Sequence, residues 1–457
     1  MPADVPGQKQ PHDAAGEKPL SDAERPPGYL AGGGQMIASG PAEIEVSRWR
    51  QAFSAFHYPV YRMIWAGALV SNIGSWMQSI ARDWLIYELS GGNAAWLGYN
   101  AFAEGLPLIL LLPLGGVLSD RFSRRWLLVA TNAASALLAI MLAGLTFTEV
   151  LRPWHILVIT SLNACVDSVR VPANQALLPS LVDRADMGNA VAMNSIQFNL
   201  SRIAGPALGG LTLKLLGPVW SFGLNALSFA AVIVPLVRMP RSNRRRADEA
   251  TVSMKSHLGE GLRYIAGRPD LLMMFLLIVI AGLFTAPVIK MLPALANQGF
   301  HGDESLFAMM LSGFGVGAVV GAVLLAMRSR NAPTPWRAFP VLMALGACEI
   351  VMGLTEQRWL AIVMIGFAGC MFVGTMARLN TAILYSTPDR FRGRTMSFHQ
   401  ISFRIGLPIG GLIAGGIAQS ISIERAFWVF GVGMLLVVPV IFLLVRAVKV
   451  QYEPSDD

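Results

Sequence analysis

The sequence predicts an all-α polytopic membrane protein with 12 transmembrane helices in two pseudo-symmetric six-helix halves. Of its 457 residues, 54% are hydrophobic and 14% are charged, whereas a soluble domain carries about 25% charged residues. Apolar blocks recur from about Met63 to Val445, each near the ~20 residues that cross a bilayer. A soluble enzyme, a collagen-like fibre and a disordered chain do not fit this composition.

The predicted spans and their flanks divide the chain into five parts. Residues 1–56 are expected to be a disordered cytoplasmic tail, rich in Pro, Gly and charge, with a basic juxtamembrane segment. Residues 57–237 form the first half, 238–270 a cytoplasmic linker, 271–447 the second half and 448–457 a cytoplasmic tail. The predicted spans are 63–87, 95–118, 126–147, 154–175, 189–214, 217–237, 271–293, 305–327, 338–355, 359–380, 394–419 and 424–446.

The net charge of +8 has a topological explanation. Lys and Arg gather in the loops on one side of the predicted spans, including the run Arg241–Arg246. This bias predicts that both termini are cytoplasmic and that the positive side contacts membrane lipid, with no nucleic-acid partner. The first span is expected to act as the insertion signal, because residues 1–50 lack an apolar signal core. The three cysteines lie in apolar blocks without metal-binding spacing, so we expect neither a disulfide framework nor a metal or other cofactor.

The two halves carry a repeated pattern. Four residues of the fifth span recur in the eleventh at an offset of 202: Arg202, Ile203, Pro206 and Gly209 match Arg404, Ile405, Pro408 and Gly411. Similar halves with helices interrupted by Gly and Pro at matching places are typical of secondary transporters whose site lies between the halves.

The loop between the second and third spans holds the most specific motif, Gly115–Arg125. Gly116 is expected to allow close approach of a neighbouring helix, and Asp120 to pair with an Arg or cap a helix N-terminus. Arg121, Arg124 and Arg125 are expected to anchor the loop at the headgroups. We predict that these residues form a conformational latch.

This motif resembles the signature loop of the major facilitator superfamily. Further segments look like the branch of bacterial exporters that includes the enterobactin exporter: Trp76–Gln78, Asp83–Tyr87, Pro172–Pro179, Asn194-Ser195, Arg202–Pro206 and Arg392–Arg394. The resemblance covers roughly residues 57–447. It implies the 12-helix fold, alternating access, proton-driven efflux, the bacterial inner membrane and a monomer. The matching loop of the second half, Met327–Arg330, lacks the Asp.

The fifth span contains Gly205, Pro206, Gly209 and Gly210, which resemble a motif associated with antiporters of this superfamily. Pro206 removes a backbone hydrogen bond and the glycines thin the helix, so a bend and a close helix contact are expected. Plain helix packing explains the same residues without any role in transport.

Ionisable residues inside spans are costly and are therefore functional candidates. A proton-coupled exporter needs a carboxylate that loads and releases protons near neutral pH. Glu104 has no charged neighbour at i±3 or i±4, whereas Asp167 has Arg170 at i+3. Asp167 is therefore either a proton-coupling site or one half of a static ion pair with Arg170. We predict Glu104 and Asp167 as proton-coupling candidates, followed by Asp83. Because Asp83 lies near the outer end of its span, the alternative is that its side chain is simply hydrated at the outer membrane surface.

The candidate substrate-binding residues are Asn163, Arg170, Asn199, Arg202 and Arg404. Asn163, Asp167 and Arg170 share one face of the fourth span, and Asn199 and Arg202 share one of the fifth. Arg202 and its counterpart Arg404 either attract an anionic or catecholate-like substrate or form a salt bridge across the halves. The remaining spans hold charged residues that we do not predict as sites: Lys290 and Arg378 near span ends, where they can snorkel, and Glu349.

The chain has no GxxxxGK[ST] loop and no HExxH or GxSxG motif, so we expect no ATPase and no enzyme. The sequence favours a secondary transporter that exports small amphiphilic molecules, drug-like compounds or siderophores, by proton antiport. A lysophospholipid flippase or an uptake carrier of the same fold is one alternative. A non-transporting membrane receptor or scaffold is another.

Overall fold

The computed structural model describes residues 53–239, 263–328 and 335–447. Several predictions fall outside these ranges: most of the N-terminal tail, the basic run Arg241–Arg246, residues 329 and 330 of the second-half loop, and the tail 448–457. The side chains of Arg392 and Arg394 are likewise outside the described part.

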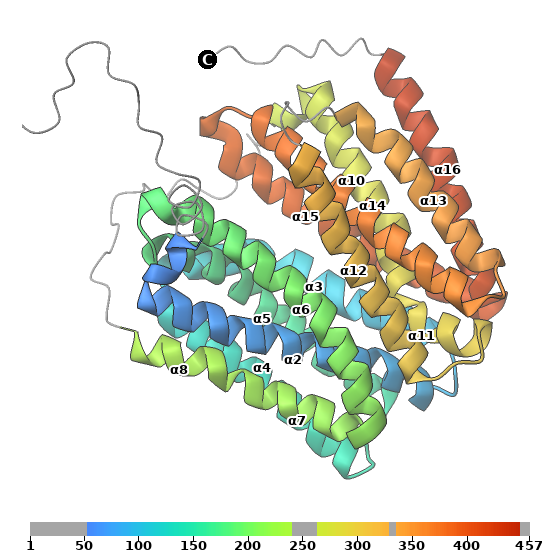
Figure 1. Cartoon of the computed structure of the whole chain (residues 1–457), viewed down its shortest axis with the longest axis horizontal. Helices are drawn as coiled ribbons and strands as arrows, with labels where there is room; N and C mark the ends of the chain where they lie inside the picture. Colours follow the sequence, from blue (N-terminus) through green and yellow to red (C-terminus); the bar gives the residue numbers. More distant parts are fainter. Residues whose placement is uncertain (1–52, 240–262, 329–334, 448–457) are drawn as a thin grey trace, which may run out of the picture. The chain divides into compact units, whose positions relative to one another are not determined.

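The described residues form helices and no strands (Figure 1). The long helices are α2 (Pro59–Leu89), α3 (Ala95–Arg121), α4 (Arg124–Phe147), α5 (Pro153–Leu177), α6 (Met187–Leu216), α7 (Pro218–Ser228), α8 (Ala230–Arg238), α10 (Pro269–Lys290), α12 (Glu304–Arg328), α13 (Ala338–Leu354), α14 (Arg358–Tyr385), α15 (Asp389–Ser420) and α16 (Ile423–Ala447). Short helices connect them: η1 (Ser54–His57), η2 (Leu178–Ser180), η3 (Arg184–Asp186), α11 (Leu292–Ala294), η4 (Leu295–Gly299) and η5 (Pro335–Arg337).

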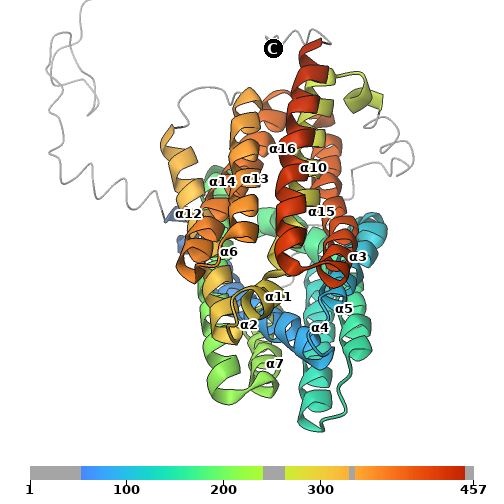
Figure 2. The same cartoon turned by 90° about the vertical axis from the view of Figure 1, so that its right-hand side faces the viewer.

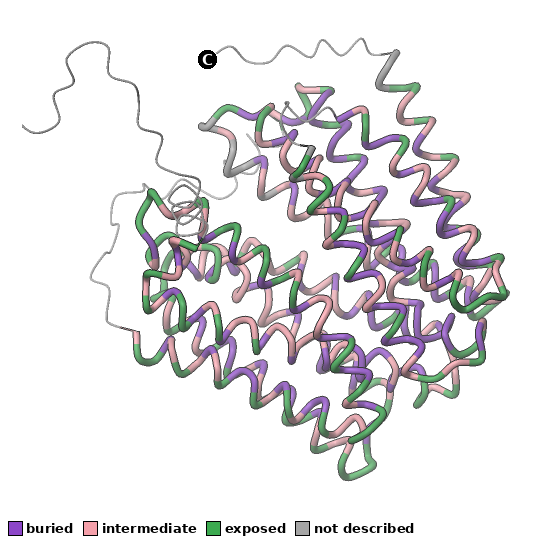
Figure 3. The backbone as a smooth tube through the Cα atoms, in the orientation of Figure 1, coloured by how far each residue is buried: buried purple, intermediate pink, exposed green. Residues whose placement is uncertain are grey.

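Each predicted span coincides with a long helix, the sixth being divided between α7 and α8. Within the described ranges, ten segments are long and apolar enough to cross a membrane; α2 and α6 are not among them. Large apolar side chains remain exposed on the bundle surface, such as Leu110 and Leu227, where lipid rather than water would cover them. Figure 3 shows buried and exposed residues alternating along the helices. Residues 54–56, which the sequence analysis places in the basic juxtamembrane segment before the first span, belong to η1.

The start of α2 is fixed to the start of α6 by hydrogen bonds. The hydroxyl of Tyr58 donates to Asp186 Oδ2 at 2.8 Å, and that of Tyr61 donates to the carbonyl of Ala190 at 2.9 Å. The bond to Asp186, together with burial, raises the pKa of Tyr58 to about 12, because the hydroxyl must keep its proton to donate it.

Glycine contacts explain how closely the helices pack. A Cβ added at Gly115 in α3 would lie 1.9 Å from the carbonyl oxygen of Ser168 in α5, so only glycine fits there. Gly116, by contrast, faces open space. The sequence predicted the close approach at Gly116, and this was wrong: the neighbouring glycine makes the contact, because the rotation of α3 turns Gly115 toward α5.

Glycines also allow the first-half helices α2–α8 to meet the second-half helices α10–α16. A Cβ at Gly98 in α3 would lie 2.5 Å from the carbonyl oxygen of Gly411 in α15, and one at Gly210 in α6 would lie 2.2 Å from Ala308 Cβ in α12. We call the end of these helices that carries loops 90–94 and 291–303 the distal end, and the end that carries residues 119–125 the motif end. At the distal end α11 also contacts α2 (Figure 2).

Candidate functional site

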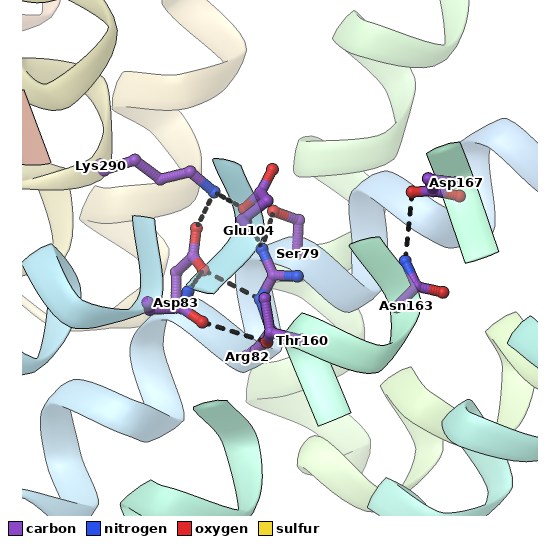
Figure 4. Close-up of polar contacts among 9 residues, drawn as sticks. Ser79, Arg82, Asp83, Glu104, Thr160, Asn163, Asp167 and Lys290 are labelled. Carbon is purple, nitrogen blue, oxygen red and sulfur yellow. Dashed lines mark hydrogen bonds and ion pairs between the residues drawn. The ribbon is translucent and has the colours of Figure 1, made fainter. Parts of the chain in front are cut away.

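A cluster of four charged side chains joins the two halves near the distal end (Figure 4). Lys290, the last residue of α10, places its Nζ 2.8 Å from Glu104 Oε2 in α3 and 3.1 Å from Asp83 Oδ2 in α2. Arg82 completes the cluster, with Nε 3.1 Å from Asp83 Oδ1 and Nη2 3.1 Å from Glu104 Oε2. We call Arg82, Asp83, Glu104 and Lys290 the charge cluster.

Neutral side chains hold the carboxylate of Asp83 in place. Asn100 Nδ2 donates to Asp83 Oδ1 at 2.9 Å, and the hydroxyl of Thr160 donates to Asn100 Oδ1 at 3.1 Å. Asn100, Thr160 and Asp83 are all buried. The chain of bonds therefore connects α5, α3 and α2 to the lysine of the second half, with each polar atom paired as buried groups require.

The charge cluster is neutral as a whole, with two cations and two carboxylates. The Asp83 side chain is 6% exposed, whereas that of Glu104 is 36% exposed. Glu104 is thus the carboxylate of the cluster that water reaches most easily. A proton on Glu104 would leave the cluster with a net positive charge and remove its attraction to Lys290, the residue that belongs to the other half.

Two interpretations from the sequence are corrected here. Lys290 does not snorkel, because its side chain is 14% exposed and bound to two carboxylates. Asp83 does not sit in surface water. Glu104 has no charged neighbour at i±3 or i±4, as the sequence states, but Arg82 and Lys290 reach it from other helices, which the spacing along its own helix could not reveal.

Asp167 lies outside the charge cluster, on α5. Arg170 Nη2 lies 2.6 Å from Asp167 Oδ1, the i, i+3 pairing expected from the sequence. Asn163 Nδ2 donates to Asp167 Oδ2 at 3.3 Å, so Asn163, Asp167 and Arg170 do share one helix face. Arg404 of α15 interacts electrostatically with both Asp167 and Glu104, which makes it a second cation of the second half near carboxylates of the first.

The two pseudo-symmetric arginines have different surroundings. The guanidinium carbon of Arg202 lies 4.7 Å from the ring centroid of Phe314 and 5.9 Å from that of Trp76. No carboxylate among the described residues pairs with it. Asn199, one turn earlier, donates its amide to the carbonyl of Ser195 at 2.8 Å and so binds its own helix.

The latch motif bonds to helix ends of its own half. Arg124 Nη1 donates to the carbonyl of Ala176 at 2.9 Å, and Arg125 donates to the carbonyls of Val237 and Met239. These carbonyls lie at or near the C-terminal ends of α5 and α8, where cations are favoured. The side chains of Asp120 and Arg121 are exposed, and neither side chain forms a hydrogen bond or ion pair with another described residue.

The fifth-span motif makes the predicted close contacts. A Cβ at Gly205 would lie 2.3 Å from Trp76 Cβ, and one at Gly209 would lie 2.9 Å from Met77 Cα. Pro206 lies inside α6, and the helix continues on both sides of it. Gly205 and Gly209 therefore seat α6 on α2, while Gly210 meets α12. No set of three or more metal-binding side chains gathers within the described ranges.

A family model described as transmembrane secretion effector matches residues 50–456. Similar curated proteins include the staphyloferrin A transporter of Staphylococcus aureus, 22% identical over 84% of this chain and 96% of that protein. A multidrug efflux pump of Mycolicibacterium fortuitum is 24% identical over 84% of this chain and 95% of the pump. The enterobactin exporter of Shigella boydii is also 24% identical, over 85% of this chain and 92% of the exporter.

Solved structures share the fold. A bacterial homologue of the human lysosomal transporter Spinster, in an inward-facing and unoccupied conformation, superposes with a TM-score of 0.68 at 13% identity, over 87% of this chain and 98% of the other. The nucleoside transporter NupG gives a TM-score of 0.67 at 12% identity, over 84% and 98%. The chain therefore belongs to the transmembrane secretion effector family of major facilitator superfamily transporters, which are integral membrane proteins and not enzymes.

Proposed function

We propose that this protein exports small amphiphilic molecules, drug-like compounds or siderophores, by proton antiport with alternating access. The observation that carries the proposal is the charge cluster, in which Lys290 of one half binds Glu104 and Asp83 of the other. The relatives named as a multidrug efflux pump and an enterobactin exporter support the direction. Together with the staphyloferrin A transporter they support the substrate class.

Proton coupling follows from the charges. Ionised Glu104 attracts Lys290 and favours the conformation in which the distal ends are joined. A proton on Glu104 removes this attraction and therefore favours the conformation in which they are apart. A proton can shift this equilibrium only through its different affinity for the two conformations, and an ion pair made in one of them supplies that difference.

Asp167 is the second proton-coupling candidate. Its carboxylate is bound by Arg170 of the same helix, but Arg404 of the second half also acts on it. Protonation of Asp167 would weaken the attraction to Arg404 in the same way. Glu104 has the stronger case, because Lys290 contacts it directly from the other half.

We place the protein in the inner membrane of a bacterium. The positive charge of the motif-end loops supports an orientation in which both termini lie in the cytoplasm. The distal end then faces outward, and the conformation with joined distal ends is inward-facing. Asp120 and the arginines beside it would act as the cytoplasmic latch when the motif ends close. We further propose that the protein works as a monomer among membrane lipids, without a cofactor.

The test uses purified full-length protein in liposomes that contain a pH-sensitive dye, under an imposed proton gradient. A panel of dyes, antibiotics and catecholate siderophores is added to wild type, Glu104→Gln and Asp167→Asn. Glu88→Gln is the matched control, because Glu88 lies on the neighbouring helix and is exposed. Substrate-dependent proton flux that Glu104→Gln or Asp167→Asn abolishes, and Glu88→Gln keeps, is the expected result.

Other outcomes separate the rivals. Substrate movement without proton flux, unchanged in all variants, indicates a facilitator or uptake carrier and overturns antiport. A labelled lysophospholipid serves as an additional probe, and its movement between leaflets, without movement of any panel compound, indicates a flippase. No movement of any compound by folded protein indicates a receptor or scaffold on the same fold.

A further inference from the structure

Arg202 occupies the contact between the two halves. It lies in the middle of α6, where the backbone of α12 approaches so closely that a Cβ at Gly315 would lie 2.8 Å from the Arg202 carbonyl oxygen. Its guanidinium faces the rings of Phe314 from α12 and Trp76 from α2. Phe314 is fully buried, and Gly205 fixes Trp76 by packing against its Cβ. The aromatic surroundings of Arg202 are therefore rigid.

The charge of Arg202 has no carboxylate partner among the described residues. Arg82 and Arg170 each bind a carboxylate directly. A guanidinium inside a membrane-spanning bundle is costly without a counter-charge. The ring faces offset part of this cost through cation–π attraction, but they leave the N–H groups at the edge of the guanidinium free to donate.

The repeat makes the contrast sharper. Arg404 occupies the equivalent position in the second half, and the carboxylates of Glu104 and Asp167 act on it. Neither arginine forms an ion pair with a described carboxylate, but Arg404 lies in the field of two carboxylates, whereas Arg202 lies against two aromatic rings. The half-exposed ring of Phe198 adjoins Trp76, with centroids 6.5 Å apart, and adds apolar surface beside the cation.

We infer that Arg202, with Trp76 and Phe314, is the subsite that binds an anionic group of the transported molecule, so that the substrate is an organic anion with an aromatic or otherwise planar part. This inference rests on the proposed export function and specifies its substrate class. The stacked guanidinium presents paired N–H donors, which match the two oxygens of a carboxylate. The partly exposed rings of Trp76 and Phe198 beside it favour a flat neighbour over a branched aliphatic one.

The experiment compares two probes that differ in the charge of one group, salicylate and salicylamide. Equilibrium dialysis of the purified full-length chain in detergent measures both dissociation constants. We expect wild type to bind salicylate at least about tenfold more tightly than salicylamide, the size of a charge-assisted hydrogen bond. In Arg202→Gln the two constants should agree within about twofold, and Arg202→Lys should give an intermediate ratio because it keeps the charge but loses the paired donors.

Arg425→Gln is the control, because Arg425 is an exposed arginine near the distal end, and it should keep the wild-type ratio. A monodisperse gel-filtration profile establishes that each variant is folded. Equal binding of the two probes by wild type, or an acid preference that survives in Arg202→Gln, overturns the inference. Export of the panel of dyes, antibiotics and siderophores, measured separately in liposomes, reports on the proposed function. Export without acid preference removes only the inference. Acid preference without export of any compound removes only the function.

Discussion

Replacing Lys290 by Met would remove one of the two cations of the charge cluster while keeping a long apolar side chain. Asp83 and Glu104 would then share Arg82 alone, and the net charge of the cluster would change from zero to −1. Both contacts of Lys290 cross between the halves, so the substitution acts on the joined distal ends and leaves the packing inside each half intact.

The magnitude follows from burial. Removing one partner of a buried ion pair costs about 3–5 kcal/mol. Glu104 is 36% exposed, so solvent screens the attraction between Lys290 and Glu104. This screening lowers the expected cost to about 2–4 kcal/mol. The equilibrium between joined and separated distal ends should therefore shift by roughly 30- to 900-fold toward separation.

Electron–electron distance measurements on spin-labelled protein test this shift, in a background without Cys165, Cys348 and Cys370. One label pair at Glu149 and Gln357 reports the distal end; both residues are exposed. A second pair at Phe122 and Tyr385, also exposed, reports the motif end. In Lys290→Met the distal distance should lengthen and the motif-end distance should shorten.

Lys214→Met is the control at the same end of the bundle. Lys214 Nζ lies 3.7 Å from Asp303, and both side chains are more than half exposed, so its loss should change the equilibrium by less than about 1 kcal/mol. Unchanged distance distributions in Lys290→Met, or equal shifts in both variants, would refute the reasoning that the charge cluster holds the distal ends together.

Three further predictions concern the motif loop. Gly115→Leu should lower the melting temperature or prevent folding, because its Cβ would clash with α5. Gly116→Leu places its side chain in open space and should melt within a few degrees of wild type. Thermal unfolding followed by circular dichroism measures both variants. Asp120→Ala should impair transport in liposomes while membrane insertion stays normal, and wild-type flux by a well-expressed variant would contradict the latch. Arg125→Gln should reduce stability by about 1 kcal/mol, since it loses bonds to the carbonyls of Val237 and Met239, as chemical unfolding would measure.

The sequence by itself determined the features that depend on nearby residues. The positions of the helices follow from apolar blocks, because each span must bury its own backbone hydrogen bonds in lipid. The pairing of Asp167 with Arg170 follows from helical spacing. The close packing of Gly205 and Gly209 was expected because small residues let helices approach. The family followed from the motif loop.

Only the tertiary structure decided which distant residues meet. Lys290 lies 207 residues from Asp83 and 186 from Glu104, so no local pattern places them together. The rotation of α3 decides that Gly115 rather than Gly116 contacts α5. Arg202 and Arg404 occupy equivalent positions in the repeat, yet Arg202 lies against the rings of Trp76 and Phe314 while Arg404 lies in the field of Asp167 and Glu104, because the helices packed against them come from elsewhere in the chain. Periodicity is a property of one helix, whereas the environment of a side chain is set by several.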